Sequence, residues 1–150
     1  MDREQRFLQI FYTYREVNQA FYHVVAKVAQ RHGLTPLQLI VLRILEEFPD
    51  IRLAELSEKL NLGNSTASGI VDRMTKAGLV IRERAENDRR AMMLRLSEKG
   101  LALWEESNMT RTKLLRPLMS LSDEDQEHLL RIQHRMIQIL KNISEDDLHD

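Results

Sequence analysis

Residues 53–80 read LAELSEKLNLGNSTASGIVDRMTKAGLV. Leucines recur at every third or fourth position of residues 53–60, which predicts a short amphipathic helix. A tight turn follows at Gly63, and Asn64 or Ser65 is suited to cap a second helix. A short helix, a glycine-containing turn and a second helix follow the order of a helix-turn-helix motif.

The second helix of this motif has two chemically different faces. Its apolar positions predict a buried face made of Ala67, Ile70, Val71 and Met74. The opposite face is small, polar or basic, and the residues expected to meet DNA there are Asn64, Ser65, Thr66, Ser68, Gly69, Arg73 and Lys76. Such a face fits the major groove, about 12 Å wide, and its cations reach backbone phosphates. On an isolated helix the same face would be interpreted as a solvated surface.

Gly69 is unusual because it lies in the middle of this predicted helix. A glycine there costs about 1 kcal/mol relative to alanine. Close approach of the helix to a DNA groove would explain it, and so would close packing against a neighbouring helix. The sequence favours neither explanation.

The residues that follow predict a β-hairpin. Segments 79–84 and 92–96 are strand-like, with Met92, Leu94 and Leu96 on one face, and residues 85–91 are expected to join them. The candidate residues at the hairpin tip are Asp88, Arg89 and Arg90. A narrow cationic tip suits the minor groove, where negative potential is focused. A charged turn is commoner by itself, but the helix-turn-helix upstream favours a wing that contacts DNA.

A helix is also predicted immediately before the motif. Thr35 can cap it, Pro36 suits its first position, and Gln38 completes a capping box. Its body, LQLIVLRILEEF, is nearly all apolar. We therefore expect a buried central helix that stops near Pro49.

Long helices flank this middle region. Residues 4–31 repeat apolar side chains at spacings of three and four, and Gly33 ends the pattern. Ser97 is suited to cap another long helix that breaks near Pro117, and Ser122 starts the last one. The apolar seams of the first and last helices need other helices to cover them.

The sequence resembles the MarR family of winged helix-turn-helix transcription regulators. The segments that carry the resemblance are 34–45, 53–80 and 81–100. The family's wing carries Asp-x-Arg, matched here by Asp88 and Arg90, whereas Ser97 stands where the family often has threonine. The resemblance implies that Arg90 enters the minor groove, that Asp88 orders the wing, and that helix 64–77 lies in the major groove.

The resemblance also implies a domain organisation. The expected fold is mainly α-helical with a small β-hairpin wing: a winged helix-turn-helix (35–96) flanked by N- and C-terminal dimerisation helices (1–34 and 97–150). The seam residues expected at a homodimer interface are Phe7, Ile10, Tyr14, Val17, Leu129, Ile132, Met136, Ile139 and Ile143. Packing of the first helix on the last within one chain is the alternative. A two-fold dimer would read a near-palindromic operator with half-sites roughly 34 Å apart.

Composition limits the other classes of function. The chain has 150 residues, 43% hydrophobic and 30% charged, and no cysteine, which excludes disulfides and thiolate metal sites. Signal-peptide and membrane-span patterns are lacking, so we expect a cytoplasmic protein. The net charge of −1 is uneven, because residues 122–150 hold eight acidic and three basic residues. The overall charge argues weakly against a polyanionic partner, but the net positive charge of the remaining residues reopens that question.

Ligands and alternatives complete the predictions. The family often binds small aromatic anions, and the residues that could line such a pocket are Phe11, Tyr12, Arg15, Tyr22 and His23. Simple packing of the first helix and its interface is the favoured explanation of these residues. Glu124 and His128 have the spacing of a metal pair but lack further ligands, so no metal, cofactor or enzymatic activity is expected.

We expect a DNA-binding repressor released by a small ligand. The alternative is a protein-interaction module, which the acidic C-terminal segment favours and the wing arginines oppose.

Overall fold

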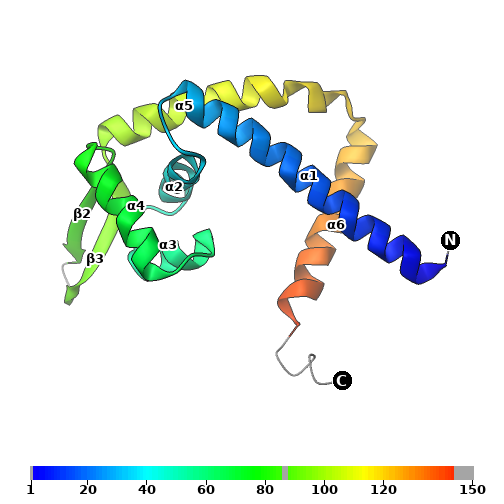
Figure 1. Ribbon diagram of the computed structural model, residues 1–150, viewed down its shortest axis with the longest axis horizontal. Coiled ribbons are helices and arrows are strands. Elements are labelled where there is room, and N and C mark those ends of the chain that lie inside the picture. The colour runs from blue at the N-terminus through cyan, green and yellow to red at the C-terminus, as the bar shows by residue number, and fades with distance from the viewer. Residues whose placement is uncertain (1, 86–87, 144–150) are drawn as a thin grey trace. The chain divides into compact units, whose positions relative to one another are not determined.

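The computed structural model describes residues 2–85 and 88–143, and it divides into one unit that ends at Leu114 and another that begins at Leu115 (Figure 1). The elements are α1 (Arg3–Arg31), α2 (Pro36–Glu47), β1 (Ile51–Arg52), α3 (Leu53–Leu60), α4 (Asn64–Lys76), β2 (Val80–Ala85), β3 (Asp88–Leu96), α5 (Glu98–Leu115), a 3₁₀ helix η1 (Arg116–Ser120) and α6 (Asp123–Lys141). The predicted order of helices and hairpin is confirmed.

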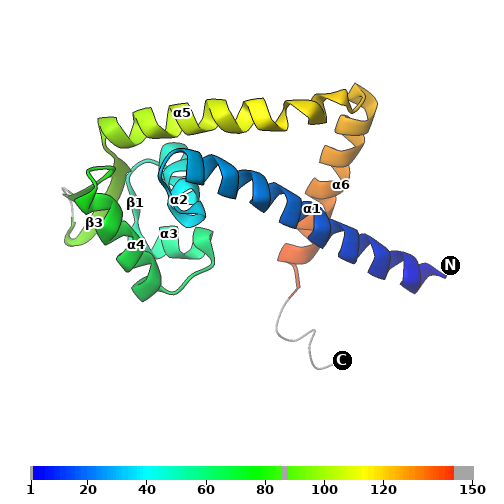
Figure 2. The ribbon, with the colours of Figure 1, turned by 45° about the horizontal axis from the view of Figure 1, so that its top comes forward.

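The core of the first unit is built around α2. This helix buries its apolar residues Leu39, Val41, Leu42, Ile44 and Leu45. It lies between α3 on one side and α5 on the other, where Trp104 packs into the same core (Figure 2). The C-terminal end of α1 closes the core with Val28 and Ala29, both fully buried. The predicted central position of this helix is therefore confirmed.

The helix ends follow the local signals in the sequence. Thr35 caps α2: its Oγ1 accepts a hydrogen bond from the Gln38 N–H at 3.1 Å, and the Gln38 side chain accepts one from the Thr35 N–H at 3.1 Å. Gly33, with φ of +70°, follows α1 in the left-handed conformation that glycine adopts without strain. The Ser97 Oγ accepts a hydrogen bond from the Gly100 N–H at 3.0 Å at the start of α5.

The hairpin is longer than predicted and belongs to a three-stranded antiparallel sheet in the order β1-β3-β2. The prediction that residues 85–91 form the connection is wrong, because β2 continues to Ala85 and β3 begins at Asp88. β1 was not predicted: two residues are too few to show a strand period. Ile51 of β1 pairs with Leu94 of β3, and both side chains are buried.

The prediction that Met92, Leu94 and Leu96 share one face of their strand agrees with their alternate positions in β3, but this face meets the core only at its inner end. Leu94 is buried and Leu96 packs against the core. Met92 is exposed, because it pairs with Arg84 further along the hairpin than the core extends. The outer part of the hairpin therefore projects beyond the hydrophobic core.

The second unit consists of η1 and α6. Pro117 lies in η1, as expected for the predicted break. Ser122 caps α6, and its Oγ accepts a hydrogen bond from the Asp125 N–H at 3.1 Å. Across the described helices of both units, none is long and apolar enough to cross a membrane.

Candidate nucleic-acid interface

Helix α4 separates apolar and polar residues as its sequence predicts. Its buried residues are Ala67, Ile70, Val71 and Met74. Asn64, Ser65, Thr66, Arg73 and Lys76 are exposed, whereas Ser68 and Gly69 are half-buried. The structure therefore brings all seven predicted contact residues together on one element and leaves most of them open to solvent.

The start of α4 differs from the prediction. Neither Asn64 nor Ser65 is the cap: Gly63 is the N-cap residue, Asn64 already belongs to the helix, and no side chain caps this end. The left-handed conformation of Asn61, with φ of 53°, ends α3 two residues before Gly63. The first N–H groups of α4 are thus open to an external acceptor such as a phosphate oxygen.

The surroundings of Gly69 test one of its two explanations, close packing within the chain. A Cβ atom built on Gly69 would meet only the Arg73 side chain, at 3.6 Å, among the atoms of the described chain. That is an ordinary van der Waals contact with a residue of the same helix. Close packing against a neighbouring helix is therefore excluded as the reason for this glycine.

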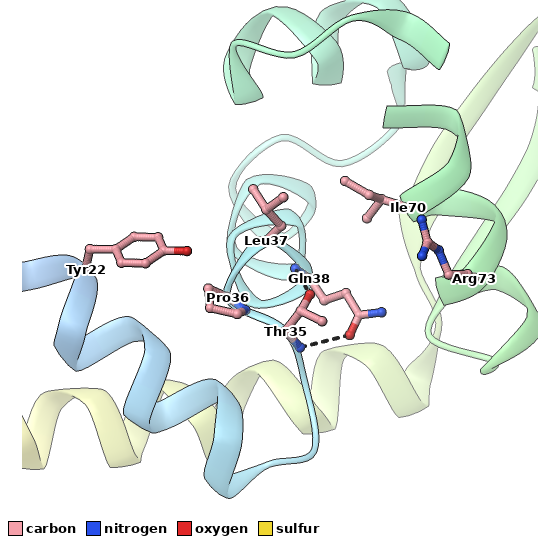
Figure 3. Close-up of a pocket in the computed structure, with 7 residues that line it drawn as sticks. All are labelled: Tyr22, Thr35, Pro36, Leu37, Gln38, Ile70 and Arg73. Atoms are coloured by element: carbon pink, nitrogen blue, oxygen red, sulfur yellow. Dashed lines mark hydrogen bonds between the residues drawn. The ribbon is translucent and has the colours of Figure 1, made fainter. Parts of the chain in front are cut away.

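Arg73 lies back along its own helix. Its Nε donates a hydrogen bond to the Gly69 carbonyl oxygen at 3.2 Å. Its guanidinium lines a cavity of about 260 Å³ next to the start of α2 (Figure 3). The cavity is lined by Tyr22, Thr35, Pro36, Leu37, Gln38, Ile70 and Arg73. Arg73 thus reaches the side of α4 that meets α2.

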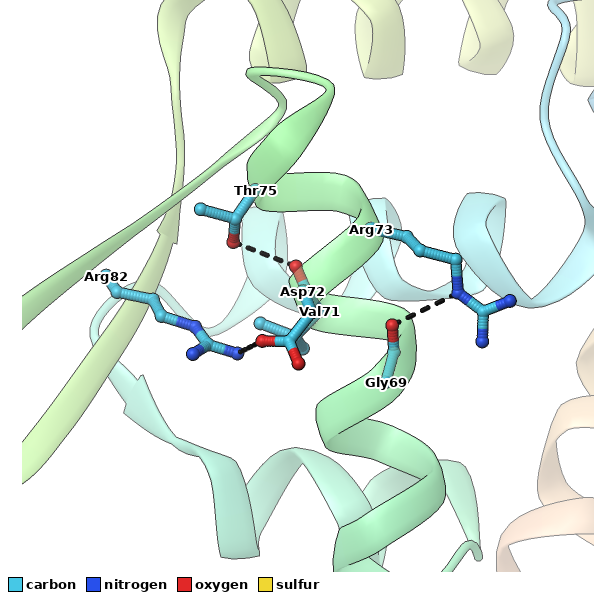
Figure 4. Close-up of polar contacts among 6 residues, drawn as sticks. All are labelled: Gly69, Val71, Asp72, Arg73, Thr75 and Arg82. Carbon is cyan, nitrogen blue, oxygen red and sulfur yellow. Dashed lines mark hydrogen bonds and ion pairs between the residues drawn. The ribbon is translucent and has the colours of Figure 1, made fainter.

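A contact not predicted from the sequence joins α4 to the hairpin. The Asp72 carboxylate forms an ion pair with Arg82 of β2, on the side of α4 away from Arg73 (Figure 4). The two residues are ten positions apart across a turn, so no helical or strand spacing could have paired them. The one available signal is Asp72 itself, an acid on an otherwise neutral or basic surface.

The hairpin carries the wing residues at its outer end. Asp88 pairs with Ala85 as the first register position of β3, and Arg89 and Arg90 follow it in the same strand. Their side chains lie outside the described part of the structure. Closer to the core, Glu83 forms an ion pair with Arg95 across the two strands. This diagonal pair links the two strands that carry the three residues.

A second, smaller cavity of about 60 Å³ lies among α1, α2 and α5. It is lined by Val25, Leu39, Ile40, Arg43, Trp104, Ser107 and Arg111. The Arg111 guanidinium lies over the Trp104 ring, 5.2 Å from its centroid, and donates a hydrogen bond to Asn108 Oδ1 at 2.6 Å. Burial, and then the nearby Arg43 guanidinium, lower the pKa of Arg111. Arg43 itself forms an ion pair with Glu47 at 2.9 Å, so Arg111 is the cation of this cavity that lacks an acidic partner among the described ion pairs.

The residues predicted for a ligand pocket are only partly found at cavities. Tyr22 lines the larger cavity. Phe11, Tyr12, Arg15 and His23 are exposed on α1 and line neither cavity. Sequence reasoning missed Arg111 and Trp104, which lie seven residues apart on one face of α5. Within the described ranges, no group of three or more histidine, aspartate or glutamate side chains could hold a metal ion.

The predicted dimerisation residues are open in the single chain. On α1 and at the end of α6 they include some of the most exposed large apolar side chains, such as Phe7 at 64% and Ile139 at 59%. Ile10, Tyr14, Val17, Leu129, Ile132 and Ile143 are also exposed, and Met136 is half-buried. Exposed apolar stripes of this kind are typical of protein interfaces.

A helix-turn-helix followed by a hairpin wing defines a winged helix DNA-binding protein, the class to which this fold and site belong. The MarR family profile matches residues 32–91. The regulator YsmB of Bacillus subtilis is 30% identical over 133 residues, covering 81% of this chain and 91% of that protein. The chain belongs to the MarR family of transcription regulators.

Two further comparisons agree with this assignment. The homoprotocatechuate degradative operon repressor of Escherichia coli is 32% identical over 90 residues, covering 60% of this chain and 59% of that protein. A solved MarR family protein from Bacillus stearothermophilus superposes with a TM-score of 0.82 at 29% identity, covering 95% of this chain and all of that one. The predicted family and fold class are confirmed.

Proposed function

We propose that this protein is a homodimeric, sequence-specific DNA-binding repressor that a small anionic ligand releases from its operator. In this proposal α4 enters the major groove with Asn64, Ser65, Thr66, Ser68, Gly69, Arg73 and Lys76. The hairpin tip with Asp88, Arg89 and Arg90 enters the adjacent minor groove. Repression is steric, because a bound dimer covers the promoter. The protein is expected to act in the cytoplasm and to catalyse no reaction.

One observation carries the DNA-binding part of the proposal. Helix α4 buries four apolar residues and exposes a polar surface whose neighbour is a projecting hairpin. A solvated helix does not need a hairpin held beside it by an ion pair such as Asp72–Arg82. A pair of DNA-contacting elements does, because the major and minor grooves must be entered together.

The proposed dimer is supported by the exposed apolar stripes of α1 and α6. A monomer in water would leave Phe7, Ile10 and Ile139 open to solvent at a cost of about 25 cal/mol per Å² of apolar surface. A two-fold dimer covers such surfaces and presents two copies of α4 to a near-palindromic operator. The functional division into residues 35–96 for DNA and residues 1–34 and 97–150 for dimerisation follows from this arrangement.

The proposed ligand site is the cavity beside Arg43 and Arg111. A carboxylate placed between the two guanidinium groups would relieve their repulsion, and an aromatic ring would lie against Trp104 only after the helices part to enlarge the cavity beyond its volume of about 60 Å³. The cavity joins α1 and α5 to α2, so an occupant can bias the position of the helix-turn-helix. The relative that is named as an operon repressor supports the repressor role.

The first experiment is fluorescence anisotropy of the purified protein on pooled genomic duplex fragments at several salt concentrations. We expect tight and steeply salt-dependent retention of a few fragments, which would also supply the operator. Weak binding that is equal across all fragments would contradict the proposal and leave the protein-interaction module as the better function.

The ligand part has its own test. Benzoate and hydroxybenzoates are titrated into the complex of protein and selected duplex, with Arg111→Gln as the variant and Arg116→Gln as the matched control. We expect these anions to release the wild-type and control proteins but not the variant. Release of all three proteins at the same concentration would exclude this cavity as the site.

A further inference from the structure

Helix α4 contains a single acidic residue, Asp72, among residues that are otherwise neutral or basic. Its side chain is about half exposed. A negative charge on a helix that approaches phosphates opposes binding, because the affinity for DNA comes largely from cations. The presence of Asp72 therefore needs a reason other than direct contact with DNA.

Arg82 supplies that reason. Val80 and Arg82 lie on the same face of β2, since side chains two residues apart on a strand point to the same side. Val80 is buried in the core, and Arg82 forms the ion pair with Asp72 (Figure 4). The ion pair thus continues the contact between α4 and the hairpin past the edge of the hydrophobic core.

The internal stiffness of the hairpin makes this contact effective. Glu83 and Arg95 are paired across β2 and β3, and β1 pairs with the inner end of β3. Because β2 and β3 are paired in regular register from Val80 to Arg84, an attachment at Arg82 is expected to set the direction in which the hairpin leaves the core. Exposed ion pairs contribute little to folding stability. The main effect of the Asp72–Arg82 pair is therefore on the orientation of the hairpin relative to α4.

We propose that Asp72 is a positioning residue that fixes the angle between the reading helix and the wing through its ion pair with Arg82. This inference rests on the proposed function, because the angle matters only if both elements contact DNA at once. The structure thereby gives an acidic residue of the DNA-facing helix a favourable role in DNA binding.

The variant Asp72→Asn distinguishes the positioning role from a simple charge effect, because the two predict opposite changes in affinity for DNA. Loss of a negative charge beside DNA should tighten binding if only charge matters. The positioning role instead predicts about fivefold weaker binding to a duplex that the wild-type protein has selected from genomic fragments. Glu55→Gln on α3 is the matched control, with the same charge change on another exposed carboxylate, and should bind as well as the wild type or better.

A double-mutant cycle with Arg82→Gln tests whether Asp72 acts through its ion pair with Arg82. In the Arg82→Gln background, Asp72→Asn should no longer weaken binding, because the pair is already broken. Asp72→Glu, which keeps the carboxylate, should recover most of the affinity. Hydroxyl-radical footprints should lose protection of the minor groove in Asp72→Asn and keep it at the major-groove contacts. Thermal unfolding should change little in any of these variants.

The outcomes are distinct. Equal or tighter binding by Asp72→Asn, or an equal loss in both backgrounds, would overturn the positioning role while leaving the proposed function in place. A wild-type protein that selects no duplex from the pool would overturn the proposed function and this inference together.

Discussion

Two glycines show how the same residue type serves different purposes. Gly100 is buried, and a Cβ atom there would lie 2.1 Å from the Leu79 carbonyl oxygen. At Gly69, by contrast, the nearest atom outside the helix backbone would be 3.6 Å away. The chain itself therefore requires glycine at position 100 but not at position 69, where the proposed approach of DNA would account for it.

The variant Gly69→Ala should stabilise the protein and weaken its binding to DNA. Alanine favours a helix by about 1 kcal/mol relative to glycine, and its methyl group fits the free protein. In a groove the methyl group would stand where the DNA approaches the helix backbone. Urea denaturation and anisotropy on the selected duplex measure the two effects. Full affinity in a stabilised variant would show that DNA does not approach this residue closely.

The variant Gly100→Ala should lose stability by about 1–3 kcal/mol, because the added methyl group forces the start of α5 away from Leu79. The Leu79 carbonyl oxygen also accepts a hydrogen bond from the Ser97 N–H at 3.0 Å, so this displacement would strain the cap of α5. Urea denaturation gives the free energy of unfolding. Leu101→Ala, an exposed neighbour on the same helix, is the control and should cost less. Unchanged stability of Gly100→Ala would mean that α5 shifts without strain.

At the scale of elements, the hairpin combines a fixed base with a charged outer end. Its base is held by the buried pair of Ile51 and Leu94 and by the two ion pairs of Arg82 and Arg95. Its outer end extends beyond the core from Arg84 and Met92 onward. A fixed base and a projecting outer end are expected of a hairpin that presents contact residues beyond the hydrophobic core.

The variant Arg90→Ala tests the wing. We expect binding weakened by about 1–3 kcal/mol and a salt dependence reduced by about one unit of slope, because one phosphate-neighbouring cation is lost. Arg31→Ala, at an exposed position in the last turn of α1, removes the same charge from another element and should change neither value much. Wild-type affinity and slope in Arg90→Ala would show that the wing does not touch DNA.

At the scale of the whole molecule, exposed apolar surface is concentrated on α1 and α6. The proposed interface would bury Ile139, which is 59% exposed in the single chain. Gln138 precedes it on the polar side of the same helix and is also exposed. A negative charge can therefore be introduced at position 139, inside the proposed interface, and at position 138, outside it, and the two effects compared.

The variant Ile139→Glu should raise the dissociation constant of the dimer at least about tenfold, since an unpaired carboxylate would be buried at the interface. Gln138→Glu should leave it unchanged. Sedimentation equilibrium measures both. If Ile139→Glu dimerises like the wild type, α6 is not part of the interface. A monomeric wild-type protein would contradict the proposed dimer itself.

The sequence by itself determined the helices, the hairpin and the buried face of α4. Helical spacing, the Thr35 capping box and the Ser97 and Ser122 caps are local signals, and local signals act within a few residues of the chain. For the same reason the candidate contact residues of α4 could be chosen from the pattern alone.

The tertiary structure alone decided what depends on residues far apart in the chain. The pairing of β1 with β3, the contact of Gly100 with Leu79, the Asp72–Arg82 ion pair and the cavity beside Arg43 and Arg111 each join separate elements. No periodicity encodes these contacts, because they arise only when helices and strands pack against one another. The extent of the hairpin was likewise decided by cross-strand hydrogen bonding rather than by the apolar pattern, which ends with the core.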